Sequence, residues 1–318
     1  MKNIYSNIRK VNTKILSKAV NHLKRNDLIG VPTETVYGLA GNAYSRNSVK
    51  KIYSLKKRPK FNPLIIHYLN KDQIANDVIL NNNFFRIYKN LCPGPITFIL
   101  KKKISSKVTS LATANLKTIA IRFPKNKMIR KLLKEINFPL AIPSANKSGG
   151  ISPVEPKDVA EEFGGKVKLI IDDGKTKIGL ESTVIDLTGR AKILRPGSIS
   201  AEKISKILRS KVLTERKFKK IKSPGSIKKH YSPGIPMLLN QKIVNKNFAF
   251  IAFGSKYKND KNIFNLSKES DLDEAAKNLY RIFRIIKNKN YKKIYVAKIP
   301  NRGIGIAIND RLNHAAKF

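Results

Sequence analysis

Short apolar runs and longer amphipathic stretches alternate along the first two thirds of the chain. Apolar runs bounded by turn residues predict buried strands at 28–31, 63–69, 96–100, 118–123, 140–143, 169–171 and 183–187. Apolar positions three or four residues apart predict helices at 3–25, 46–55, 83–91, 127–136, 156–163 and 201–208. Strands and helices in alternation predict a layered α/β domain over residues 1–209.

The pattern changes after residue 209. Residues 210–235 carry many lysines, two Ser-Pro dipeptides and little apolar periodicity, which predicts a linker. A free linker has no need of the His230-Tyr231 pair that it contains, so we expect it to pack over another part of the protein. The remaining residues, 236–318, predict a small βαβ-type domain with strands at 248–253 and 294–296 and helices at 272–286 and 309–316.

Composition narrows the class of protein. Its 318 residues include one cysteine and four histidines, which excludes a disulfide framework and makes a metal site built from cysteines or several histidines improbable. No apolar stretch reaches the roughly 20 residues of a membrane helix, and the basic N-terminus lacks the apolar core of a signal peptide. We therefore expect a cytoplasmic protein without membrane contact.

The net charge of +44 has two explanations. A basic surface favours contact with polyanions such as RNA, because phosphate binding releases counterions. Compositional drift, which we favour, accounts for lysines that are scattered along the chain rather than grouped. Charge therefore does not decide the function.

A cationic group follows the helix expected at 46–55. Lys56-Lys57-Arg58, with Asn62 shortly after, suits a triphosphate, because Arg offers a planar fork and Lys a point charge. The other explanation is a solvated charge run. No P-loop sequence is present, so any nucleotide would be bound in another way.

Two strand ends carry further candidates. Ser144 and Asn146 precede a glycine-containing loop and could position a nucleotide, although Ser and Asn serve equally well in turns. Alternation places Arg122 on an otherwise apolar strand face, where it needs an anion, either a substrate carboxylate or an internal acid. His67 could be a general base, a core residue or, as we favour, a hydrogen-bond partner of the substrate.

Together these motifs resemble the YrdC-type threonylcarbamoyl-adenylate synthases in their longer two-domain form. The resemblance rests on Lys56-Lys57-Arg58, Ser144-Ala145-Asn146 and the segments PTETVYGLA, ESTV, ILRPG, KHYSP and INDRLNHAA, in this order. It implies an open, twisted mixed sheet with flanking helices, joined through a linker to a small Rossmann-like domain. It also implies synthesis of threonylcarbamoyl-AMP from L-threonine, bicarbonate and ATP, for the modification of tRNA next to the anticodon.

The resemblance also implies a set of ligands. Threonine would be held by Thr35, His67, Arg122, Ile142 and Ser182. ATP would be held by Lys56, Arg58, Asn62, Thr118, Ser144, Asn146, Ser152, Arg195, His230 and Tyr231. Lys56 and Arg58 would stabilise the phosphates, no protein nucleophile is required, and Mg²⁺ would arrive with ATP rather than on protein carboxylates. Partners would be the downstream machinery that transfers the threonylcarbamoyl group to tRNA, with weak RNA binding by the enzyme itself.

Two alternatives belong to other classes. A non-catalytic RNA-binding protein with a similar basic cleft would need the lysines but not Thr35, His67 or Ser182. A carbamoyltransferase of the hydrogenase-maturation type would need zinc-binding cysteine pairs, which Cys92 alone cannot supply.

Overall fold

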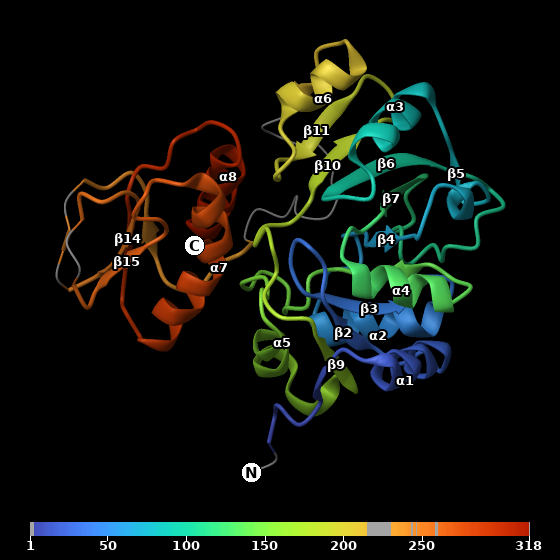
Figure 1. Cartoon of the computed structure of the whole chain (residues 1–318), viewed down its shortest axis with the longest axis horizontal. Coiled ribbons are helices and arrows are strands. Elements are labelled where there is room, and N and C mark those ends of the chain that lie inside the picture. Colours follow the sequence, from blue (N-terminus) through green and yellow to red (C-terminus); the bar gives the residue numbers. More distant parts are fainter. Residues whose placement is uncertain (1–2, 215–229, 243, 246, 258–259, 318) are drawn as a thin grey trace.

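The computed structural model describes residues 3–214, 230–242, 244–245, 247–257 and 260–317. These form a large α/β unit and a smaller C-terminal one (Figure 1). The large unit is built on a mixed sheet in the strand order β1-β9-β2-β3-β8-β4-β7-β6-β10-β11-β12, with β5 added beside β6. Its strands are β1 Ile8–Lys10, β2 Ile29–Val31, β3 Gly38–Asn42, β4 Ile65–His67, β5 Val78–Ile79, β6 Ile96–Lys102, β7 Thr118–Arg122, β8 Leu140–Ala141, β9 Leu169–Asp172, β10 Thr183–Asp186, β11 Lys192–Arg195 and β12 Leu213–Thr214.

Helices cover both faces of this sheet. The apolar sides of α1 (Thr13–Lys24) and α4 (Lys127–Glu135) share one buried cluster. Another cluster joins the sheet to α2 (Arg46–Lys56), α3 (Asn82–Leu91), α5 (Pro156–Phe163) and α6 (Ala201–Leu208). Two short 3₁₀ turns, η1 (Asp72–Ile74) and η2 (Gly164–Lys166), complete this unit. The predicted layered arrangement, an open mixed sheet with flanking helices, is confirmed.

Most of these helices begin where the sequence supplies a cap. An Asn or Ser side chain accepts a hydrogen bond from an amide of the first turn at five starts, those of α1, α2, α3, α4 and α6. Such caps satisfy amides that have no partner inside the helix. The helix starts are thus encoded by residues next to them in the chain.

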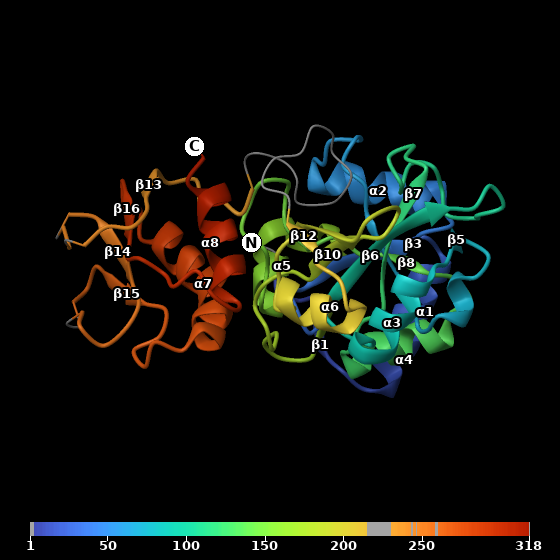
Figure 2. The same ribbon diagram turned by 90° about the horizontal axis from the view of Figure 1, so that it is seen from above.

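The C-terminal unit has a four-stranded parallel sheet in the order β13-β16-β14-β15. Its elements are β13 Met237–Leu238, β14 Ala249–Ala252, β15 Ile263–Asn265, α7 Leu272–Asn288, β16 Ile294–Val296 and α8 Gly305–Ala315. Figures 1 and 2 show α7 and α8 between this sheet and the large unit. The smaller α/β domain is as predicted in kind, but it has two more strands than the sequence pattern indicated.

Several expected boundaries are wrong. The helix expected at 3–25 begins at Thr13, because Ile8–Lys10 instead pairs in parallel with β9 and Asn12 caps the helix. The last helix begins at Gly305 rather than at residue 309. Strands β3 and β11 fall in segments for which no strand or helix was predicted. β3 pairs with β8, about a hundred positions away in the chain, whereas β11 forms a short hairpin with β10.

The predicted linker is described only in part. Leu213–Thr214 forms β12 beside β11, and residues 230–235 are described, whereas 215–229 lie outside the described residues. The domain boundaries at 209 and 235 stay predictions.

The two units share a hydrophobic core. Val36, Ile151 and Leu180 of the large unit belong to the same buried cluster as Leu279 and Tyr280 of α7. Burial of apolar surface from both sides holds the units together at the edge where the predicted site residues lie. In the described part of the chain no helix has the length and apolar character needed to span a membrane.

Candidate functional site

A cavity of about 40 Å³ opens where strands and loops from distant parts of the large unit meet. Eight of the fifteen predicted site residues line it: Thr35, Arg58, His67, Arg122, Ile142, Ser144, Arg195 and His230. Sheet register explains part of this convergence. His67 on β4 pairs with Arg122 on β7, which in turn pairs with Thr97 on β6, so the three residues form one row across the sheet.

Arg58 and Asn62 form a compact unit at one side of the cavity. The Arg58 Nε donates to the Asn62 carbonyl oxygen at 2.9 Å, and a terminal nitrogen donates to Asn62 Oδ1 at 2.6 Å and to the Pro63 carbonyl oxygen at 2.7 Å. Burial lowers the pKa of Arg58 to about 10, so the group remains a cation at neutral pH. Asn62 Nδ2 has no hydrogen-bond partner among the described residues. Arg58 thus presents positive charge to the cavity, and Asn62 Nδ2 is a free donor buried beside it.

Lys56 lies behind this unit rather than in the cavity. Its buried Nζ donates to the Ser144 carbonyl oxygen at 2.5 Å and also to the Asn146 carbonyl oxygen. Burial, together with the neighbouring Arg58, lowers the pKa of Lys56 well below its usual value. In this structure Lys56 ties the end of α2 to the Ser144–Asn146 strand end, and contact with phosphate stays a prediction.

Asn146 stabilises its own loop. Its Nδ2 donates to the Lys147 carbonyl oxygen at 2.8 Å and to the Gly150 carbonyl oxygen at 2.9 Å. The Nδ2 group therefore has the role in a turn that the sequence left open, whereas Asn146 Oδ1 has no partner among the described residues. Its predicted contact with ATP is not tested by these bonds.

Arg122 has an internal partner. A terminal nitrogen donates to Glu34 Oε1 at 2.8 Å, which is the internal ion pair that the sequence left open. Burial acts to raise the pKa of Glu34, but the adjacent Arg122 outweighs it and the net shift is downward. Arg122 Nε has no partner among the described residues, so the guanidinium keeps a free donor beside the cavity. Glu34 was missed by the sequence reasoning, although it lies within the PTETVYGLA segment.

His67 is neutral and has one free nitrogen. Burial lowers its pKa well below the usual value, and the positive charge of Arg122 lowers it further. Its Nδ1 lies 3.3 Å from the Ile65 carbonyl oxygen, so Nδ1 carries the proton in that bond and Nε2 is left as an acceptor. Nε2 has no partner in the described part of the chain. The site therefore offers an acceptor to a hydroxyl or an ammonium group.

Hydroxyl groups and Arg195 form another wall. Ser182 Oγ lies 2.7 Å from Thr97 Oγ1, and Arg195 donates to Ser182 Oγ at 3.1 Å and to the Ser182 carbonyl oxygen at 3.1 Å. Thr35 Oγ1 lies 2.8 Å from Thr33 Oγ1, next to the β2–β3 turn. Ser182 itself is buried behind the cavity lining, held in place by Arg195.

Glu181 joins the cavity to the C-terminal unit. This buried carboxylate accepts hydrogen bonds from Ser152 Oγ at 2.5 Å, from the Tyr280 hydroxyl at 3.0 Å and from Arg311 Nε at 2.8 Å. Burial acts to raise the pKa of Glu181, but Arg311 and Arg195 lower it to about 2. This pair was not predicted from the sequence, because Glu181 in the ESTV segment and Arg311 in the INDRLNHAA segment lie 130 positions apart in the chain.

His230 and Tyr231 point to different places. His230 lines the cavity, and burial lowers its pKa to about 3, so it is neutral. Tyr231 has a φ of 64° and is fully buried against the C-terminal unit, stacked on Tyr280 with ring centroids 5.9 Å apart and covered by the Arg311 guanidinium at 5.0 Å. The expectation that the segment packs over the site holds for His230, whereas Tyr231 anchors it.

Two other predicted positions need comment. Thr118 lies half-buried at the opposite end of β7 from Arg122 and does not line the cavity, so its assignment to ATP stays a prediction. Ile142 lines the cavity, but its amide donates to the Ile65 carbonyl oxygen at 3.0 Å.

Among the described residues, no three or more His, Cys, Asp or Glu side chains converge on a point that could hold a metal ion.

Two family models match the chain. Residues 21–197 match the family described as "Telomere recombination", and residues 199–317 match the "Threonylcarbamoyl-AMP synthase, C-terminal domain". Among curated proteins, the chain is 34% identical to the threonylcarbamoyl-AMP synthase of Pyrococcus abyssi, covering 94% of this chain and 93% of the relative. It is 32% identical to the synthase of the same name from Bacillus subtilis, covering 95% and 92%.

A solved structure has the same arrangement of both units. The crystal structure of Pyrococcus abyssi Sua5 complexed with L-threonine superposes with a TM-score of 0.89 at 31% identity, covering 97% of this chain and 96% of that one. The similarity extends over both units.

Proposed function

The chain belongs to the threonylcarbamoyl-AMP synthase family and is an enzyme that makes an adenylate, and we propose that its cleft joins L-threonine, bicarbonate and ATP with release of pyrophosphate. One observation carries the proposal. A single buried cavity brings neutral His67 and ion-paired Arg122 together with the cations Arg58 and Arg195. Such a cavity suits an amino acid at one end and phosphates at the other.

L-Threonine is the amino-acid substrate, since a close structural relative binds it and the synthase relatives are named for it. We assign the free Nε2 of His67 as the acceptor for its hydroxyl or ammonium group. Arg122 would bind the carboxylate through Nε, the donor that Glu34 leaves free. Thr35 and Ser182 would supply further hydroxyl contacts, and the main chain at Ile142 would close this end.

The phosphates would lie against the cationic wall. Arg58 remains charged despite its burial, and Asn62 Nδ2 is a free donor beside it. Arg195 adds a second guanidinium at the cavity. Ser144, Asn146 and Ser152 are proposed to contact the rest of ATP, and Lys56 to position the Ser144–Asn146 strand end.

The reaction needs alignment more than a protein nucleophile. The threonine amine takes up carbon dioxide from bicarbonate to form a carbamate. A carbamate oxygen then attacks the α-phosphorus, the bond to the β-phosphate breaks, and pyrophosphate leaves. Fixed cations stabilise charge that develops on the phosphates, while the walls hold the two reactants in line.

The His230 segment is proposed to act as a lid. In this structure His230 lines the cavity and is buried, so the segment would open before the nucleotide enters and close again after it. Tyr231 is held between Tyr280 and Arg311, and His230 would close over the cavity by moving about this fixed neighbour. Closure would exclude water from a labile carbamate.

Cofactor and partners are also part of the proposal. The described residues offer no carboxylate cluster, and the Glu181 carboxylate is occupied by Arg311, so Mg²⁺ would be held by the phosphates and water. The product would feed a class of reaction that transfers the threonylcarbamoyl group to tRNA. The alternative of a non-catalytic RNA-binding protein is not favoured, because the curated relatives are named as synthases.

The test follows pyrophosphate release from ATP and bicarbonate with different amino acids. We expect release with threonine, none when threonine is omitted, and at least about a hundredfold less with valine, which keeps the shape but lacks the hydroxyl for His67. Serine, which keeps the hydroxyl, serves as the matched comparison. Release that is independent of threonine would refute the synthase assignment, and equal rates with valine would exclude the hydroxyl as the group that His67 binds.

A further inference from the structure

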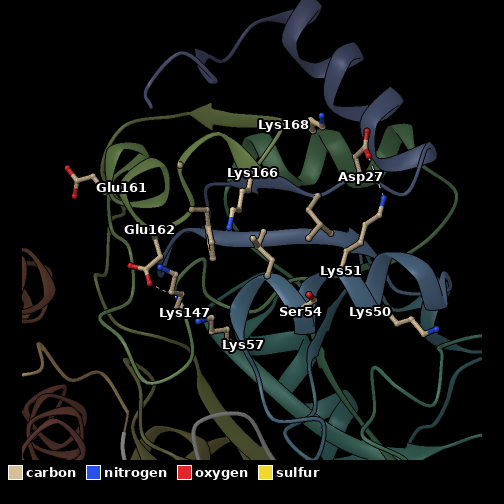
Figure 3. A pocket seen from close by; sticks show the side chains of 14 residues that line it. Asp27, Lys50, Lys51, Ser54, Lys57, Lys147, Glu161, Glu162, Lys166 and Lys168 are labelled. Carbon is tan, nitrogen blue, oxygen red and sulfur yellow. Dashed lines mark hydrogen bonds and ion pairs between the residues drawn. The ribbon is translucent and has the colours of Figure 1, made fainter. Parts of the chain in front are cut away.

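A second, larger cavity of about 830 Å³ lies outside the cleft (Figure 3). It is bounded by α2, by the end of α5 with η2, and by the loop at Lys147. None of the fifteen residues predicted for the synthase site lines it. Six lysines from three separate stretches of the sequence do: Lys50, Lys51, Lys57, Lys147, Lys166 and Lys168.

The acidic residues of this cavity are already engaged. Asp27 is paired with His22 at 3.1 Å and with Lys51 at 3.6 Å. Glu162 accepts the Lys147 amide at 2.7 Å. Glu161 accepts a bond from the Tyr5 hydroxyl at 3.3 Å, and Figure 3 shows its side chain turned away from the cavity. Within the described part of the chain, only Lys51 of the six lysines is paired with a carboxylate.

The cavity is separated from the cleft by the connection that Lys56 makes. Lys57, in a left-handed conformation at the end of α2, lines the larger cavity, whereas its neighbour Lys56 is buried. In the same way Lys147 lines this cavity while its neighbour Asn146 is buried. The two cavities therefore have no lining residue in common.

We propose that this cavity is a second anion site, which binds a compact small molecule carrying several phosphate groups. Several ammonium groups around one hollow repel one another, and a multiply charged anion relieves that repulsion. The volume is in the range of small-molecule sites, roughly 300–1,000 Å³, and Leu28, Leu55 and Phe163 supply apolar walls. A polyphosphate or a nucleotide fits such a hollow better than an extended nucleic acid, which needs a basic groove that continues along the surface.

The test is calorimetric titration of the full chain with inorganic tripolyphosphate, in the presence of threonine and a non-hydrolysable ATP analogue that occupy the cleft. The cavity variant is Lys57→Gln/Lys147→Gln/Lys166→Gln, in exposed residues. Its control, Lys14→Gln/Lys18→Gln/Lys131→Gln, removes the same three charges from exposed positions on α1 and α4. The difference in tripolyphosphate Kd between the two variants distinguishes binding in this cavity from attraction to the overall charge, and it does not depend on the synthase reaction.

We expect one tripolyphosphate per chain, with a Kd weakened roughly tenfold or more in the cavity variant and changed less than twofold in the control. Equal weakening in both variants would show attraction to overall charge and overturn the proposal, as would absence of binding to the wild type. A short single-stranded RNA that binds more tightly than tripolyphosphate, and only with the cavity lysines intact, would overturn the ligand class. Thermal melting checks that each variant is folded. If the triple variant is not, Lys147→Gln/Lys166→Gln replaces it, against Lys14→Gln/Lys18→Gln.

Discussion

Replacing Glu181 by glutamine tests the connection between the cleft and the C-terminal unit. The substitution keeps the size of the side chain but removes the charge that faces Arg311 at 2.8 Å, in a position only 6% exposed. Arg311 and Arg195 hold the pKa of Glu181 at about 2, against an ordinary value of 4.5, so the ionised carboxylate in this environment stabilises the folded protein by about 3 kcal/mol at neutral pH. Removing one partner of a buried ion pair typically costs about 3–5 kcal/mol, a figure that does not depend on the pKa. The two figures agree.

The dependence on pH gives the prediction its sign. A carboxylate whose pKa is lowered by folding contributes fully above the unfolded value of 4.5, and the contribution is lost as the pH falls toward the folded value of about 2. We therefore expect Glu181→Gln to lower the free energy of unfolding by about 3 kcal/mol at pH 7 and by much less at pH 3. Urea unfolding followed by circular dichroism suits this chain, which has no tryptophan. A loss of under about 1 kcal/mol at pH 7 would refute the reasoning.

Two further variants separate the pair from its surroundings. Asp310→Asn removes the other carboxylate beside Arg311, which is more exposed than Glu181, and we expect a smaller loss of stability from it. The double variant Glu181→Gln/Arg311→Met should be less destabilised than the sum of its two single variants, because neither partner is then buried alone. We also expect Glu181→Gln to raise the KM for threonine, since Glu181 lines the cavity and Ser182, which is proposed to contact threonine, is its neighbour in the chain.

Arg58→Ala should reduce pyrophosphate release at least about a hundredfold, because a fixed cation is removed from the phosphates. Lys60→Ala, an exposed change two residues away, should leave the rate near that of the wild type, and an active Arg58 variant would exclude that side chain from the site. Gly38→Ala would place a methyl group 2.1 Å from Ile142 Cγ2 in the cleft wall, so we expect a loss of about 1–3 kcal/mol in thermal unfolding. Gly189→Ala meets nothing within 4 Å and is the matched control, whose melting temperature should hardly change.

The sequence by itself determined most helices and the longer strands of this protein. Apolar periodicity and capping residues lie within a few positions of each other, so they can be read without knowledge of the fold. The order of the short motifs likewise indicated the family and eight residues that line the cavity. Each of these signals acts over one turn of helix or one strand, so it can be recognised from the sequence alone.

Only the tertiary structure decided the rest. β1 is a strand because it pairs with β9, and β3 is held on one side by β8, relations between segments far apart in the chain that no local pattern expresses. The partners of Arg122 and Arg311, namely Glu34 and Glu181, lie 88 and 130 positions away in the chain. A buried charge is stable only where folding brings it an opposite charge, so the sequence could show that Arg122 needs an anion but not which one it receives.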